Sequence, residues 1–150
     1  MIQNRQKLIL NKYLQNYRSI LGEEEDSFSL LSLEDTQFIN SKIVDKLNDV
    51  KMSIRETINL NDLIEMGKLL QMFNEKLSTE HLILFSENTK YCGAVNVRTE
   101  HFVQSFLKFK DILGEVISIV PEDLSCHFLV DFFTESNSDF ADVEYKSFLS

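Results

Sequence analysis

The sequence predicts an α+β fold, in which N-terminal helices precede a small antiparallel sheet of about four strands with a Phe-rich helix packed on it. Apolar residues recur at helical spacing through residues 5–78. From residue 79 onward, short apolar and β-branched runs separated by turn residues indicate strands. Because helices come first and strands later, the order favours α+β over alternating parallel α/β. The 150 residues are expected to form one domain, 1–150, with a helical part, 1–78, and an α+β part, 79–150.

The first helix is expected from Arg5 to Leu21, because its apolar residues fall on one side of a helix. Gly22 is placed to act as a left-handed C-terminal cap. The acidic run 23–26 then predicts a solvated loop, since four like charges repel one another.

A second helix is expected to begin near Ser32, which opens a run resembling a capping box, and to end near Val50 or continue to Thr57. A third helix follows a break at 59–62, with Asp62 as a candidate cap. The apolar side of this third helix comprises Leu63, Met66, Leu70, Phe73 and Leu77.

The first hairpin is expected from a strand at His81–Phe85, a turn at 87–90 and a β-rich segment at Tyr91–Val97. Gly93 lies inside the second strand, where it indicates a bulge or a close approach of another backbone.

Thr99 is expected to cap a helix that ends at Gly114. Strands are then expected at 115–120 and 125–134, and the tail, 135–150, is predicted to be an edge strand, a short helix or a loosely held end. The residues expected to be buried together are Phe102, Phe106, Phe109, Val116, Ile119, Phe128 and Val130.

The charge distribution is uneven. The formal net charge is −9, of which residues 1–110 carry −1 and residues 111–150 carry −8. An acidic segment argues against nucleic-acid binding, which needs a basic face. It favours association with a basic partner, since opposite charge raises encounter rates. The alternative is an acidic tail that only keeps the protein soluble.

Alternation along 125–135 divides this strand into two faces. Cys126, Phe128, Val130 and Phe132 form a core face. The opposite face mixes acids with apolar side chains, which is typical of protein-binding surfaces. Its members are His127, Leu129, Asp131, Phe133 and Glu135.

The longest apolar run near the N-terminus, residues 8–10, is too short for a secretory signal, which needs about 7–15 apolar residues, or a membrane span, which needs about 20. A cytoplasmic protein without membrane contact is therefore expected. Cys92 and Cys126 are interpreted as buried thiols in strand-like segments rather than a disulfide. The alternative is a catalytic cysteine with a depressed pKa and a histidine partner.

An enzyme is not expected. The sequence contains no nucleophile elbow, phosphate loop, dinucleotide fingerprint or zinc motif. His127 and Asp131 lie about 13 Å apart along a strand, too far to ligate one metal ion. No cofactor or metal is predicted.

The second half resembles small bacterial immunity proteins of contact-dependent inhibition and other polymorphic toxin systems. The resemblance covers about residues 82–135. It rests on 91–97, the Phe-rich helix, 115–119 and 128–133. It implies a cytoplasmic, non-enzymatic protein that blocks one cognate toxin, often a nuclease with a basic cleft.

The leading hypothesis is an immunity protein, a monomer or weak homodimer, that neutralises a toxin domain through an acidic C-terminal surface. The alternative is an acidic secretion chaperone or adaptor that holds an effector segment, with a stable homodimer and exposed apolar patches. The predicted partner-binding residues are Glu122, Asp123, Asp131, Phe133, Glu135, Asp139, Asp142, Glu144 and Tyr145.

Overall fold

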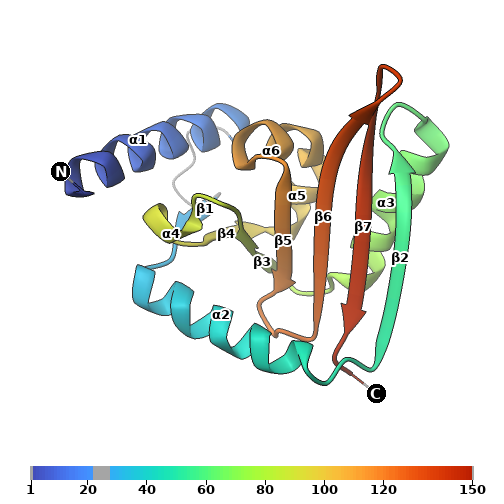
Figure 1. The fold of residues 1–150 in the computed structure, drawn as a ribbon, viewed down its shortest axis with the longest axis horizontal. Coiled ribbons are helices and arrows are strands. Elements are labelled where there is room, and N and C mark those ends of the chain that lie inside the picture. Colours follow the sequence, from blue (N-terminus) through green and yellow to red (C-terminus); the bar gives the residue numbers. More distant parts are fainter. Residues whose placement is uncertain (1, 22–27, 150) are drawn as a thin grey trace.

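The computed structural model describes residues 2–21 and 28–149, and its central element is a seven-stranded antiparallel sheet (Figure 1). The strand order is β1-β4-β3-β5-β6-β7-β2. The strands are β1 (Phe28–Leu30), β2 (Met52–Asn59), β3 (His81–Phe85), β4 (Val95–Arg98), β5 (Val116–Pro121), β6 (Cys126–Glu135) and β7 (Ser138–Ser147). The predicted α+β class is confirmed, but the sheet is larger than the expected four strands.

Helices lie on both sides of the sheet (Figure 1). They are α1 (Ile2–Leu21), α2 (Leu33–Leu47), α3 (Leu63–Lys76), α4 (Thr89–Cys92), α5 (Thr99–Gln104) and α6 (Phe106–Leu113). Helices α3, α5 and α6 cover one side, α2 covers part of the other, and α1 packs against α4 and α6. Within 2–21 and 28–149, no helix combines the length and the apolar character that crossing a bilayer requires.

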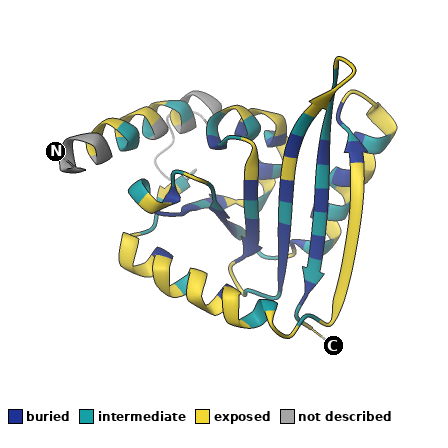
Figure 2. Ribbon diagram, viewed as in Figure 1, coloured by how far each residue is buried: buried dark blue, intermediate teal, exposed yellow. Residues whose placement is uncertain are grey.

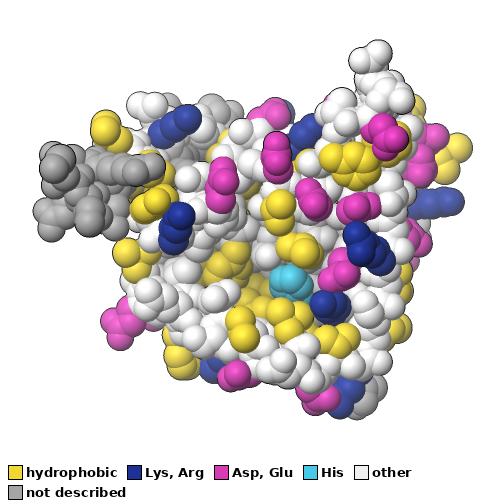
Figure 3. Space-filling view, in the orientation of Figure 1, with side chains coloured by type: hydrophobic (Ala, Val, Ile, Leu, Met, Phe, Trp, Pro, Cys, Tyr) yellow, Lys and Arg dark blue, Asp and Glu magenta, His cyan; other side chains and the backbone are white. Residues whose placement is uncertain are grey.

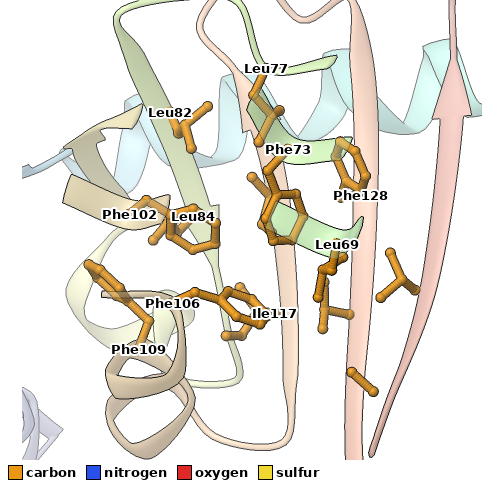
Figure 4. Packing of buried hydrophobic residues seen from close by; sticks show 14 of the residues in the cluster. Leu69, Phe73, Leu77, Leu82, Leu84, Phe102, Phe106, Phe109, Ile117 and Phe128 are labelled. Atoms are coloured by element: carbon orange, nitrogen blue, oxygen red, sulfur yellow. The ribbon is translucent and has the colours of Figure 1, made fainter. Parts of the chain in front are cut away.

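The main core is a cluster of aromatic rings between the sheet and α3, α5 and α6 (Figure 4). The ring of Phe73 lies edge-on to those of Phe106 and Phe128, with centroids 5.2 and 5.1 Å away. Edge-to-face rings contribute beyond their buried area. The predicted core is confirmed except at Val116, whose side chain is 45% exposed because Ile117 and Ile119 are the β5 residues that point inward.

A smaller apolar cluster lies on the opposite side of the sheet, beneath α2. It joins Ile43 of α2 to Ile83, Ala94 and Val120. This cluster involves only β3, β5 and their surroundings, so α2 does not extend over β6, β7 and β2 (Figure 1).

Two predicted helix caps are confirmed. The Ser32 hydroxyl accepts a hydrogen bond from the backbone N–H of Asp35 at 3.0 Å, and Asp62 accepts from Ile64 and Glu65. Gly93 has a φ of 86°, and a Cβ there would overlap the carbonyl oxygen of Leu31. The predicted close backbone approach at Gly93 is therefore correct.

The helical reading of residues 1–78 is wrong in two places. Residues 28–30 form β1 on β4, and residues 52–59 form β2 on β7 rather than extending α2. The helix α2 ends at Leu47. On α3, Leu63 is 89% exposed instead of belonging to the buried stripe, because it is the first helical residue and precedes the first turn that faces the core. The predictions for Gly22 and 23–26 lie outside the described residues.

Three local predictions after residue 87 also need correction. The strand expected over 91–97 begins only at Val95, because residues 89–92 form the helical turn α4. Thr99 is not a cap, since its hydroxyl donates to the carbonyl oxygen of Thr79 at 2.6 Å. The Phe-rich helix is divided at Ser105 into α5 and α6.

The C-terminal tail is an inner strand, not an edge strand, a helix or a loose end. β7 pairs with β6 over ten residues and with β2 over eight. Ala141, Val143 and Tyr145 are buried on the side of α3, and the residues between them face the other side.

Candidate protein-interaction face

The side of β6 and β7 that points away from α3 is not covered by any helix among the described residues (Figures 1 and 3). We call this surface the open face. It consists of the odd-numbered residues 127–135 of β6 and the even-numbered residues 138–146 of β7, with Arg55 and Thr57 of β2 and Val116 of β5 at its margins. Acidic side chains gather over this part of the molecule (Figure 3).

Two acids of the open face have basic neighbours. Asp142 lies 3.6 Å from the guanidinium of Arg55 and accepts a hydrogen bond from the Thr57 hydroxyl at 2.6 Å. Glu144 lies 3.0 Å from the ammonium group of Lys146. These partly exposed pairs fix the side chains in place, although each contributes little to stability.

Other acids at this face lack a basic partner among residues 2–21 and 28–149. Asp131 is directly opposite Asp142 in the β6–β7 register, and like charges so placed repel each other. Asp131 and Glu135 are exposed and form no ion pair within the described part of the chain. A cationic group from another molecule would relieve this repulsion.

A hollow of about 620 Å³ adjoins the open face at the start of β5. Its walls combine the carboxylates of Glu87 and Glu115 with the apolar surfaces of Phe85 and Val116. Both glutamates are exposed and lack an ion-pair partner among residues 2–21 and 28–149. Negative charge beside an apolar wall suits the aliphatic stem and charged head of a lysine or arginine.

Apolar side chains lie between the acids. Phe133 of β6 stacks on Phe140 of β7, and Leu129 and Val116 lie nearby in the register. Phe133, Phe140 and Leu129 are half-buried, while Val116 is exposed. Apolar anchors among charged residues are the composition of protein-binding surfaces.

His127 lies at the end of the open face near α2 and is 8% exposed. Burial, together with the positive charge of Lys146, lowers the pKa of His127 to about 4, although Glu144 partly opposes the shift. The imidazole is therefore neutral at physiological pH and adds no positive charge to the open face.

The structure gathers five of the predicted binding residues on one surface. Asp131, Phe133, Glu135, Asp142 and Glu144 all belong to the open face. Asp131, Phe133 and Glu135 share the side of β6 that points away from α3, and no described helix lies over this side of β6 and β7 (Figure 1).

Four predicted binding residues lie elsewhere. Tyr145 is a core residue, 6% exposed. It cannot act as a surface anchor, because its side chain points to the same side of β7 as that of Val143, towards the core. Asp139 shares that side and lies 3.8 Å from Lys110 of α6. Glu122 and Asp123 are in the β5–β6 turn, at the opposite end of a ten-residue strand from Glu135, about 30 Å away.

Sequence reasoning missed Phe140 and Glu115 as members of this region. Phe140 could have been found by alternation, because alternate residues of a strand share one face and Phe140 shares that of Asp142 and Glu144. This alternation is informative only once 138–147 is recognised as a strand. Glu115 was counted only as part of the acidic segment.

The two thiols do not fit an activated nucleophile. Burial raises the pKa of Cys126 to about 11 and also raises that of Cys92, the opposite of what a thiolate nucleophile needs. Cys92 lies in α4 rather than in a strand. Within the part of the chain that the structure describes, no group of three potential ligands is arranged to hold a metal ion.

No protein-family model matches the chain, and no curated protein matches its sequence.

Proposed function

We propose that this protein is an immunity protein that neutralises a cognate bacterial toxin domain by binding it through the open face. The observation that carries the proposal is the combination of unpaired carboxylates with the Phe133–Phe140 pair on an uncovered sheet surface. The partner is a folded protein domain with a basic surface, such as the substrate cleft of a nuclease.

The charges on the open face favour such a partner. Asp131 and Glu135, with Glu87 and Glu115 beside them, present negative charge that no ion pair within the described part of the chain neutralises. A complementary basic surface would be attracted over distances up to the Debye length, about 8 Å at 0.15 M salt. Nucleic acid would be repelled by the same groups.

The rigidity of the surface also favours a folded partner. β6 and β7 are paired along ten residues, so the carboxylates and the two Phe rings have fixed relative positions. The backbone of such a surface needs no ordering on binding, so the entropy cost is limited to the exposed side chains. A chaperone that holds an unfolded segment would instead use an apolar groove, and the open face is charged.

The proposal is tested by co-expressing the protein with toxin domains encoded by the adjacent gene and measuring cell survival. The double charge reversal Asp131→Lys with Glu135→Lys should abolish protection. The matched control, Glu75→Lys with Glu100→Lys, changes two exposed acids on α3 and α5 across the sheet and should protect like the wild type.

Two results would contradict the proposal. One is equal protection by both double variants while both remain folded. The other is binding of an unfolded effector segment in place of a folded basic domain, which would favour the chaperone function.

A further inference from the structure

The outer edge of β2 is a second exposed feature of the sheet, and unlike the open face it presents backbone groups and carries no net charge. β2 is an edge strand of eight residues, of which 52–57 are exposed, as Figure 2 shows. It contains no proline and pairs with β7 in an unbroken register without a bulge. Prolines and bulges normally help to prevent a sheet edge from pairing with another strand, and β2 has neither, although it carries the charged side chains of Arg55 and Glu56.

The direction of the β2 backbone groups follows from the ladder. The N–H of Leu60 bonds to Asp139 at 2.8 Å, and hydrogen-bonded pairs alternate along the register of residues 52–59. Lys51, just before the strand, departs from this alternation, because its N–H also bonds to β7, at Ser147. Ile54, Glu56 and Ile58 therefore bond to β7. Ser53, Arg55 and Thr57 direct their N–H and C=O groups outward, where water or another strand must satisfy them.

Apolar side chains border this edge. Met52 and Ile54 are 42% and 37% exposed and lie on the side of the sheet that carries α3, since Ile54 is opposite Tyr145. A strand added to the edge would cover both side chains as well as pair the backbone.

The local charge indicates what the added strand is. Residues 49–59 contain two acids and two bases, so the edge is neutral in a molecule whose net charge is −9. A basic partner gains nothing here, whereas a second copy of this acidic chain meets a neutral strand here instead of the unpaired carboxylates of the open face.

We propose that β2 pairs antiparallel with β2 of a second copy, with the two-fold axis at Ile54. In this register Ile54 is opposite Ile54 of the second copy, Ser53 is opposite Arg55, and Met52 is opposite Glu56. Moving the axis to Arg55 or Glu56 would place two identical charges opposite each other, which is unfavourable. The two sheets join into one across a symmetric interface.

The dimer keeps both open faces available. Opposed residues of neighbouring strands point to the same side of a sheet, so this axis is perpendicular to the sheet. Both open faces then lie on the same side of the joined sheet. The inference therefore does not depend on the function proposed above.

The first test is the mass of the full chain by sedimentation over a wide range of concentrations. The wild type should associate reversibly to a dimer. Arg55→Pro should shift the protein to a monomer, because it removes an outward N–H and leaves the bonds to β7 intact. Arg55→Ala loses the same charge but keeps the N–H, and should still dimerise.

The second test maps the axis by cross-linking. Ile54→Cys should form a disulfide-linked dimer on mild oxidation, because directly opposed residues of a non-hydrogen-bonded pair meet disulfide geometry. Glu56→Cys, on the same side of β2, should not. Asp131→Lys with Glu135→Lys should leave dimerisation unchanged.

A wild type that stays monomeric at all concentrations would overturn the proposal. So would a dimer that survives Arg55→Pro, or one that is cross-linked through residue 56 instead of residue 54. Circular dichroism of each variant ensures that loss of the dimer is not loss of the fold.

Discussion

The ring of Phe133 lies over the ring of Phe140 across the β6–β7 pair, with centroids 5.4 Å apart and planes inclined by 15°. The two rings are half-buried and stand beside Glu135 and Asp142 on the open face. Stacking holds each ring in one orientation before any partner arrives, so the apolar anchor of the proposed interface is already formed.

Replacement of this anchor should affect the lifetime of the toxin complex. Phe133→Ala should raise the dissociation rate and leave the association rate nearly unchanged, because an anchor contributes only after docking. The fold should lose about 2 kcal/mol, from one aromatic pair and the burial of a half-buried ring, which is less than the loss expected for a core Phe. Surface plasmon resonance with the cognate toxin measures both rates. Phe38→Ala, which removes an exposed ring of α2, is the control and should change neither.

Neutralising the unpaired acids should have the opposite kinetic signature. Asp131→Asn with Glu135→Gln should slow association and weaken its dependence on salt, since exposed charges steer the encounter. The difference should be largest in dilute buffer, where the Debye length is about 30 Å at 0.01 M. Stopped-flow rates over a salt series measure it. Glu75→Gln with Glu100→Gln removes the same charge across the sheet, and an equal slowing by that pair would argue against steering by the open face.

The sequence predicted the local elements correctly where the spacing of apolar residues fitted only a helix or only a strand. The helical spacing of Phe102, Phe106 and Phe109 and the alternation of Cys126, Phe128, Val130 and Phe132 both placed residues correctly in the core. These patterns are strong because each combines one period with large apolar side chains facing one way.

The prediction that α2 continues towards Thr57 was wrong, because the apolar spacing there fits both a helix and a strand. Val50, Ile54 and Ile58 are four residues apart, which fits a helix and also fits alternate positions of a strand. The choice is made by β7, whose pairing with β2 joins residues more than 80 positions away in the chain. Because β2 was missed, β7 was not recognised as an inner strand, and Tyr145 was assigned to the wrong side.

The aromatic core should be sensitive to truncation. Phe106→Ala should lower the free energy of unfolding by about 3–5 kcal/mol, because the ring is 2% exposed and contacts Phe73, Phe102 and Phe132. Denaturant titration measures the loss. Leu107→Ala, at a neighbouring side chain that is 45% exposed, should change stability far less. A loss below about 1 kcal/mol for Phe106→Ala would be incompatible with this packing.

The cysteines should resist alkylation in the native protein. Burial raises the pKa of Cys126 to about 11, so almost no thiolate forms at pH 8. Iodoacetamide should modify Cys126 slowly in buffer and rapidly in denaturant, as followed by mass spectrometry. Cys92, which is only partly buried, serves as the internal reference and should react first. Rapid modification of native Cys126 would revive the cysteine-enzyme alternative.

The stability of the fold should fall in mild acid through His127. Its folded-state pKa is depressed from 6.5 to about 4 by burial and by Lys146, so folding favours the neutral imidazole. The contribution is complete above pH 6.5 and is lost as the pH falls from 6.5 towards 4, where protonation accompanies unfolding. At 1.36 kcal/mol per pH unit, the loss reaches about 3 kcal/mol. Urea titrations from pH 7 to pH 4 measure it against His127→Gln, which cannot titrate and should show a shallower decline. Lys146→Met removes the second cause of the depression and should give an intermediate slope. Parallel declines in the wild type and His127→Gln would mean that carboxylates alone govern the acid response.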